Sequence, residues 1–245
     1  LFEKLNDEAA DVTIGGYADT SNGNRVEAQA ITLTGTGTAT VDIKKDDSTD
    51  VIVEQINKKS DATGITAKAT TTVTLSNLVN DGSVGFSLNG TSISANVTSS
   101  DLTALESAIN DQTSKTGVVA ALNDTKDALV LTDSSGADIA IEDYTNSAGG
   151  TVSVTGTGDA VKLTQGAGDS TVVGGEIEFM SSVGSFSVSS NLAASDGGLF
   201  NVSPDKLNTS TLNTLDNIDV STVEGAQAAI SAIDGALAAI DANRA

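Results

Sequence analysis

The chain has 245 residues, of which 38% are hydrophobic and only 3% aromatic. This length suffices for one large folded unit or two to three small ones, with cores built from Val, Ile, Leu and Ala. The net charge of −21 argues against nucleic acid and anionic membrane surfaces as partners, because both would be repelled. Cysteine and histidine are absent, which excludes a disulfide scaffold, a thiolate nucleophile and a Ser-His-Asp triad.

The first half of the chain contains short alternating or β-branched runs that are typical of strands. We expect strands over residues 28–34, 38–43, 83–88 and 92–97. Asn89-Gly90 lies between the last two runs and is the strongest hairpin signal in the chain. No segment approaches the ~20 apolar residues that a membrane-spanning helix needs.

An internal repeat organises this region. Residues 53–67 recur as residues 106–120, an offset of 53 residues. The matched pairs are Ile56 with Ile109, Asn57 with Asn110, Thr63 with Thr116, Gly64 with Gly117, and Ala67 with Ala120. A repeat of this length predicts a duplicated supersecondary unit.

Each copy is expected to begin as an amphipathic helix, because apolar residues recur at spacings of three and four. Asp101 in the second copy, and Ser48 or Asp50 in the first, are candidate N-caps. Gly64 and Gly117 suit the left-handed position that ends a helix. Strands are expected next, over residues 65–70 in the first copy and over 118–122 and 128–132 in the second.

The last part of the chain has a different pattern. After further strands expected at 176–180 and 183–188, Pro204 marks the change. Ser221 with Glu224 forms a capping box that predicts the start of a helix. The apolar residues that follow have the a/d spacing of a coiled coil and form a candidate assembly seam: Val223, Ala226, Ile230, Ile233, Leu237 and Ile240. About three heptads are too short to be stable alone, so partner helices are expected.

Residues 215–245 closely resemble the start of the flagellin C-terminal domain, through the run Ile218-Asp-Val-Ser-Thr222 and the spaced Gly-Ala and Ala-Ile pairs that follow. The two Ile-Asn…Thr-Gly copies are similar to the flagellin IN repeat, which also occurs in filament caps and other hook-associated proteins. The resemblance implies that the long helices of the inner domains lie outside this sequence.

The expected fold is α+β: mainly β outer domains of small antiparallel sheets, each packed with a short helix, plus a C-terminal coiled-coil helix. The expected division is 1–44, an N-terminal connecting and β segment; 45–132, duplicated IN-type units; 133–200, a further β-rich outer domain; 201–220, a linker; and 221–245, a helix of the inner rod domain.

The resemblance implies a secreted structural subunit of the bacterial flagellar filament that supports motility. Its partners would be other flagellin subunits in a homopolymer and the flagellar export and cap machinery, with glycan or host-receptor contacts left open. No enzyme activity, catalytic residue, cofactor or metal is expected.

Two acidic stretches are candidate calcium sites that we interpret as polar, solvated turns. They are Asp133 to Asp138 with Glu142 and Asp143, which lacks EF-hand spacing, and Asp46, Asp47 and Asp50. The paired glycines at 35 and 37, 156 and 158, and 166 and 168 lack the third glycine of a dinucleotide fingerprint and are interpreted as turns.

Two alternatives to a filament subunit follow from the same residues. One is a flagellin-like surface protein that acts as an adhesin or polysaccharide receptor through its Thr, Ser and Asn-rich strands. The other is the hook-filament junction protein, which resembles flagellin at its ends.

Overall fold

The computed structural model describes residues 2–5, 20, 23–156, 160–166, 168–181, 184–200 and 203–213. Its strands are β1 (Phe2–Leu5), β2 (Gln29–Thr34), β3 (Thr38–Ile43), β4 (Ile65–Ser76), β5 (Gly82–Leu88), β6 (Thr91–Val97), β7 (Val119–Leu122), β8 (Leu129–Asp133), β9 (Ile139–Asn146), β10 (Thr151–Thr155), β11 (Val161–Thr164), β12 (Thr171–Val173), β13 (Glu176–Ser181), β14 (Ser187–Ser190) and β15 (Asn208–Asn213). Its helices are α2 (Thr49–Asn57), α3 (Ser60–Thr63), α4 (Thr103–Asn110), α5 (Thr113–Thr116) and the 3-10 turn η2 (Ala194–Asp196).

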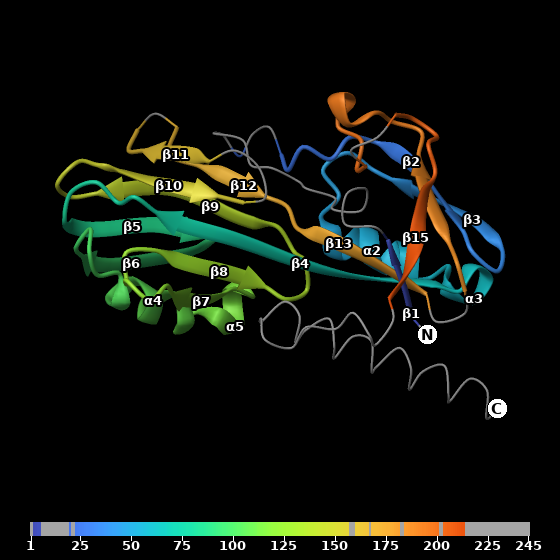
Figure 1. Cartoon of the computed structure of the whole chain (residues 1–245). Helices are drawn as coiled ribbons and strands as arrows, with labels where there is room; N and C mark the ends of the chain where they lie inside the picture. Colours follow the sequence, from blue (N-terminus) through green and yellow to red (C-terminus); the bar gives the residue numbers. More distant parts are fainter. Residues whose placement is uncertain are drawn as a thin grey trace.

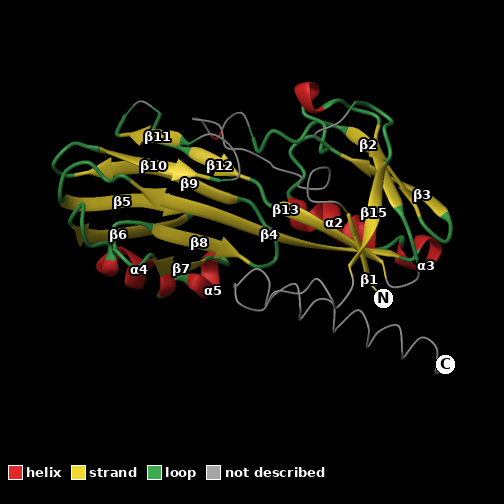
Figure 2. Ribbon diagram, in the orientation of Figure 1, coloured by secondary structure: helices red, strands yellow, loops and turns green. Residues whose placement is uncertain are grey.

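The long strand β4 connects two lobes, each with its own hydrophobic core (Figures 1 and 2). The first half of β4 pairs with β13, from Ile65 opposite Ser181 to Thr70 opposite Glu176. The second half pairs with β8, from Thr71 onward, and its last residues also pair with β10. A single strand therefore belongs to both lobes.

The first lobe contains β1, β2, β3, β13, β14, β15, α2, α3 and the first half of β4. Its core packs Ile31 and Leu33 of β2 against Ile52 and Ile56 of α2 and against Phe179 of β13. Helix α2 lies on β4 and contacts β3 and β13 as well. Leu199 and Phe200 close this core from the chain that follows η2.

The second lobe contains β5 to β12, α4, α5 and the second half of β4. A four-stranded sheet in the order β12-β9-β5-β6 shares one core with β4, β7, β8 and β10. Helix α4 contacts both β6 and β7, and Leu105 and Ile109 of this helix are buried in the core.

The chain path is nested. The second lobe is a continuous excursion that leaves the first lobe along β4 and returns along β13, which pairs with β4. The first lobe in turn lies between β1 and β15, whose register places Phe2 opposite Asn213. Figure 1 shows β5, β6 and β8 at the end of the molecule away from β1 and β15.

The predicted α+β fold class is wrong. Strands make up 46% of the described residues and helices 16%, in four short α-helices, so the fold is mostly β. The sheets are not small and separate either, because β4 is long enough to join strands of both lobes into an 11-stranded sheet. The predicted C-terminal coiled-coil helix is not part of the described structure, and its residues 221–245 lie outside it.

Several local predictions are confirmed. Strands β2, β3, β5 and β6 lie within one residue of the expected bounds, and the β5–β6 hairpin turns at Asn89 and Gly90 with φ of 46° and 76°. The strand expected at 65–70 continues to Ser76. The strand expected at 183–188 is instead β14, which begins at Ser187.

Candidate functional site

The sequence repeat builds the same hydrogen-bonded device twice, once in each lobe. We call residues 49–69 the first copy and residues 102–122 the second copy. In the first copy, Asn57 at the end of α2 reaches the backbone of Ala67 in β4. The Asn57 Nδ2 donates to the Ala67 carbonyl at 2.9 Å, and the Ala67 amide donates to the Asn57 Oδ1 at 2.7 Å.

The second copy repeats this geometry at the expected offset. Asn110 at the end of α4 donates through Nδ2 to the Ala120 carbonyl at 2.9 Å and accepts from the Ala120 amide at 2.8 Å. We call this two-bond contact between an Asn side chain and an Ala backbone the clamp. The predicted duplication is thus confirmed in its hydrogen bonds as well as in its order of elements.

A threonine fixes the turn between helix and strand in each copy. The Thr63 hydroxyl donates to the Lys59 carbonyl at 2.9 Å and accepts from the Ile65 amide at 3.2 Å. In the second copy the Thr116 hydroxyl donates to the Gln112 carbonyl and accepts from the Val118 amide, both at 3.2 Å. Each hydroxyl thereby bonds the carbonyl of the residue that caps the short helix and an amide at the start of the following strand or just before it.

The two repeat glycines end the helices as predicted. Gly64 and Gly117 have φ of 70° and 77°, in the left-handed region, and their amides donate back to Ser60 and Thr113. The predicted cap of α4 is wrong in position, because Leu102 and not Asp101 occupies the cap position, and no side-chain cap bond is made there. Asp101, one residue earlier, accepts from the Thr103 amide at 2.9 Å. Hydrogen bonds from the side chain of Thr103 and from its amide lower the pKa of Asp101. Ser48 occupies the cap position of α2 but makes no side-chain cap bond.

The clamp closes the free edge of a strand. Because the Ala67 amide donates to Asn57, it points away from β13, on the side of β4 that has no neighbouring strand at this level. The same reasoning places the Ala120 amide on the side of β7 away from β8. An Asn side chain offers one N–H donor and one carbonyl acceptor toward the strand, so it replaces one residue of a missing neighbouring strand.

Helix α4 extends this edge closure through a second side chain. The Glu106 carboxylate accepts from the Leu122 amide at 3.3 Å. Glu106 and Asn110 are four residues apart, about 6.0 Å of helix rise. Ala120 and Leu122 are two residues apart, about 6.6 Å along a strand. The helix spacing therefore matches the spacing of edge amides on β7.

The first copy closes the corresponding position differently. Val53 stands where the second copy has Glu106, and Ala69 stands where it has Leu122. The turn at Gly136 covers Ala69 instead, so closely that a Cβ on Gly136 would lie 2.1 Å from the Ala69 Cβ. The Gly136 carbonyl accepts from the Asp50 amide at 3.2 Å, which fastens this turn of the second lobe to α2.

The sequence pattern did not predict this role of the repeat. Asn57 and Asn110 are matched in the repeat, but their position at a strand edge follows only from the fold. The available signal is that Asn precedes Ala by ten residues in both copies. Glu106 carries no such signal, because the first copy has Val53 in its place.

The structure brings the two acidic stretches together at the junction of the lobes. The Asn24 Nδ2 donates to the Asp138 carboxylate at 2.9 Å and to the Asp47 carbonyl at 3.1 Å. Burial raises the pKa of Asp138 to about 6, and the nearby charges of Asp50 and Asp46 act in the same direction.

These acidic residues do not form a metal site within the described part of the chain. No group of three or more acidic side chains there has an arrangement that could hold an ion. Asp133 accepts from the amide of Ser135 at 2.8 Å in a local turn, as the sequence suggested. Glu142 and Asp143 lie in β9, where Asp143 is exposed.

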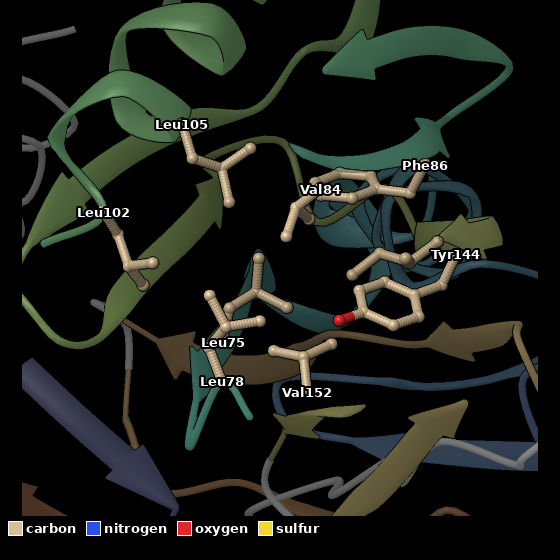
Figure 3. Close-up of a pocket in the computed structure, with 9 residues that line it drawn as sticks. Leu75, Leu78, Val84, Phe86, Leu102, Leu105, Tyr144 and Val152 are labelled. Carbon is tan, nitrogen blue, oxygen red and sulfur yellow. The ribbon is translucent and has the colours of Figure 1, made fainter. Parts of the chain in front are cut away.

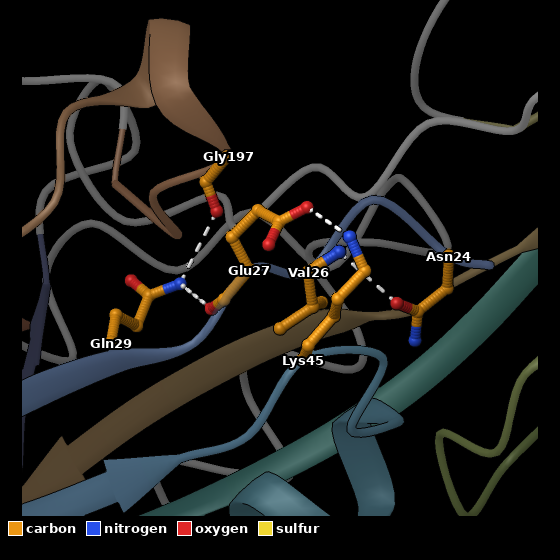
Figure 4. A network of polar contacts seen from close by, with 6 residues as sticks. All are labelled: Asn24, Val26, Glu27, Gln29, Lys45 and Gly197. Carbon is orange, nitrogen blue, oxygen red and sulfur yellow. Dashed lines mark hydrogen bonds and ion pairs between the residues drawn. The ribbon is translucent and has the colours of Figure 1, made fainter. Parts of the chain in front are cut away.

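A second polar network joins Gln29, at the start of β2, to Gly197, in the chain that follows η2 (Figure 4). The buried Gln29 donates to the carbonyls of Glu27 and Gly197, at 3.0 and 3.2 Å. It also accepts from the Ser190 hydroxyl and the Leu199 amide, at 2.7 and 3.0 Å. Its side-chain amide thus makes all four of the bonds that it can make. Beside it, Lys45 and Glu27 form an exposed ion pair.

The described residues contain a small apolar cavity and an open groove. Figure 3 shows an apolar cavity of about 10 Å³ in the second lobe, into which the Tyr144 ring points. It has room for a water molecule at most, and burial raises the pKa of Tyr144. An open groove of about 580 Å³ lies beside the start of α4; its lining is Gly82, Asn96, Val97, Thr98, Asp101, Thr103, Ala104 and Ser107.

Three further predictions concern the paired glycines, a membrane-spanning helix and the assembly seam. Gly35 and Gly37 form the tip of the β2–β3 hairpin, where the Thr36 amide donates to the Thr63 carbonyl. Within the described residues, no helix is long and apolar enough to span a membrane. The six seam residues from Val223 to Ile240 all lie outside the described residues.

Comparison with known proteins places the first copy in a family. Residues 30–82, which include β2, β3, α2, α3 and β4, match the family model of the flagellin hook IN motif. No curated protein matches the chain. Flagellins are structural proteins of the extracellular flagellar filament, into which they assemble. The matched stretch, which contains the Asn57 clamp, supports a flagellin-type protein.

Proposed function

We propose that the chain is a structural subunit of the bacterial flagellar filament, that its described lobes are exposed on the filament surface, and that it supports motility. The observation that carries this proposal, besides the flagellin motif, is the nested chain path. Phe2 pairs with Asn213, so the chain enters and leaves the folded body at one place. Such a body can project from a polymer without interrupting the contacts that hold the polymer together.

The charge of the chain supports a surface role. A net charge of −21 keeps an exposed body soluble and discourages close approach of anionic surfaces. The subunit acts by assembly and shape and not by catalysis. Its partners in this proposal are further copies of the same subunit and the flagellar export and cap machinery, and its location is outside the cell.

The apolar stripe from Val223 to Ile240 is proposed as an assembly contact. Ile230→Asp together with Ile233→Asp places two charges on the stripe, where an unpaired buried charge is strongly unfavourable. Ser231→Asp together with Ala232→Asp is the matched control, because it adds the same charges at positions off the stripe. The stripe variant should lose sedimentable filaments and swimming in cells, whereas the control should keep both. If the stripe variant forms normal filaments, the apolar stripe is not an assembly contact.

A binding role is the second candidate, and the open groove beside α4 favours it. Asn96, Thr98, Thr103 and Ser107 offer uncharged hydrogen-bonding groups of the kind that a sugar could use. A glycan array with the parent chain and with Asn96→Ala tests this role. Specific binding that the substitution abolishes would favour an adhesin or polysaccharide receptor. If the array shows no specific signal, the filament role remains the proposed function.

A further inference from the structure

We propose that Asn89-Gly90 is a self-modification site, where Asn89 loses its side-chain amide by spontaneous deamidation when the β5–β6 turn opens and keeps it while the turn is closed. The proposal goes beyond the filament role, because it concerns the chemistry of one turn. It is tested on the chain in solution and does not depend on assembly of a filament.

The reaction needs the two residues of the turn and water. The amide nitrogen of Gly90 attacks the side-chain carbonyl carbon of Asn89, and the bond from that carbon to Nδ2 breaks. Nδ2 leaves as ammonia with the proton of the Gly90 amide, and water opens the cyclic imide to aspartate or isoaspartate. Gly90 hinders the attack least because it has no Cβ, and it is exposed, with nothing within 4 Å of the place that a Cβ would take.

In the folded chain, the backbone of other elements holds both polar atoms of the Asn89 amide. Nδ2, the leaving nitrogen, donates to the Thr116 carbonyl at the end of α5, at 2.9 Å. Oδ1 accepts from the Ala140 amide of β9 at 2.8 Å, and the Asn89 backbone amide donates to the Ala140 carbonyl at 3.0 Å. The side chain must leave both partners before its carbon can reach the Gly90 nitrogen, so the reaction requires local opening of the turn.

The first lobe makes the same joint without a reactive side chain. Thr36 lies at the tip of the β2–β3 hairpin and precedes Asn89 by the offset of the repeat. Its backbone amide donates to the Thr63 carbonyl at 2.9 Å, and Thr63 is the repeat partner of Thr116. In both lobes a hairpin tip is therefore bonded to the last carbonyl of a short helix, but the second lobe makes this bond with a side-chain amide, which can be lost.

The product of the reaction cannot rebuild the joint. An aspartate at position 89 has no N–H group for the Thr116 carbonyl and places a negatively charged oxygen beside it. An isoaspartate adds one atom to the backbone of the two-residue turn, which disturbs the register that sets Leu88 opposite Thr91. Deamidation therefore loosens the contact between the β5–β6 hairpin and α5 irreversibly.

The first experiment compares the folded parent chain with the same chain unfolded in urea, at one mildly alkaline pH and one temperature. Mass spectrometry of the peptide that contains Asn89 measures conversion of the amide to an acid, and an isoaspartyl methyltransferase assay measures isoaspartate. Asn22-Gly23 is the internal reference in urea, where the same dipeptide should convert at the same rate. Asn89 should convert at least about tenfold more slowly in the folded chain, and equal rates in the two states would overturn the proposal.

A pair of variants tests whether the joint provides the protection. Gly117→Ala displaces the Thr116 carbonyl without changing the reacting dipeptide, because Gly117 has φ of 77° and a Cβ there would lie 2.6 Å from the Asp133 carboxylate. Gly64→Ala is the matched control, since it strains the corresponding position of the first copy, at φ of 70°. In the folded state Gly117→Ala should speed conversion of Asn89 about fivefold, whereas Gly64→Ala should keep the parent rate.

Equal rates at Asn89 in these two variants would overturn the proposal. Should Gly117→Ala fail to fold, the comparison of the folded and unfolded parent decides. Asn89→Asp imitates the product and should lower the melting temperature of the chain. Asn77→Asp is its control and should not, because Asn77 also has a positive φ, 53°, but its exposed amide bonds the neighbouring Ser76 hydroxyl. Parent-like melting of Asn89→Asp would overturn the proposed loosening of the hairpin.

Discussion

Asp138 at the junction of the lobes should make the stability of the fold depend on pH. Its pKa is raised from 3.8 to about 6 by burial, with the charges of Asp50 and Asp46 adding to the effect. The native state therefore holds this proton more tightly than the unfolded chain does. Its contribution is most favourable below about pH 4 and is lost as pH rises through about 6.

The difference between these pKa values corresponds to about 3 kcal/mol. Asp138→Asn removes the charge and keeps an oxygen that can accept from Asn24. At about pH 8 the variant should be more stable than the parent by up to about 3 kcal/mol, and below about pH 4 the two should be equal. Urea unfolding followed by circular dichroism measures this difference across the pH range.

Asp143→Asn is the matched control, because Asp143 is exposed on β9, the strand that begins one residue after Asp138, and should shift stability by less than about 0.5 kcal/mol at any pH. A variant at Asp138 that is less stable than the parent at about pH 8 would refute the reasoning. So would a parent-to-variant difference that does not change with pH. Repeating the series in a chelator separates the charge effect from an ion bound by the parent.

Three further predictions concern the hydrogen bonds and turns. Asn57→Ala and Asn110→Ala should each lower the free energy of unfolding by about 2–4 kcal/mol, since each leaves a backbone amide and carbonyl without partners; urea unfolding checks this, and losses under about 0.5 kcal/mol would contradict it. Gly90→Ala should cost about 1 kcal/mol for its positive φ alone, whereas Gly136→Ala should cost clearly more because its Cβ collides with β4; equal melting temperatures would contradict this. Gln29→Leu should lower the melting temperature markedly, because it removes all four hydrogen bonds of this buried amide, two of them in buried surroundings, and an unchanged value would show that the network is dispensable.

Local elements could be predicted from the sequence because their causes are local. Asn89-Gly90 fixes its hairpin through positive φ, and the glycine after each helix does the same at Gly64 and Gly117. The repeated sequence pattern predicted a helix and a following strand at corresponding positions in both copies. These features depend on residues close together in the chain, where spacing and backbone preference are sufficient.

The long-range features could not be predicted in this way. Whether β4 ends at residue 70 or continues to Ser76 depends on partners far along the chain, since β13 pairs with its first half and β8 with its second. The two acidic stretches looked like separate solvated turns, yet Asn24 and the Gly136 turn bring them together across the lobe junction. The fold class was misjudged for the same reason, because strand pairing merged the small sheets expected of each copy.

The location of the protein on the cell is the most direct test of the filament role. Antibodies against the described lobes, applied to intact cells with gold labelling, report by electron microscopy where these lobes are exposed. A filament subunit should be labelled along the whole filament, and the label should vanish in a deletion strain. Label restricted to the base of the filament would instead favour a hook-filament junction protein, and label spread over the cell body, away from filaments, would contradict the proposed function.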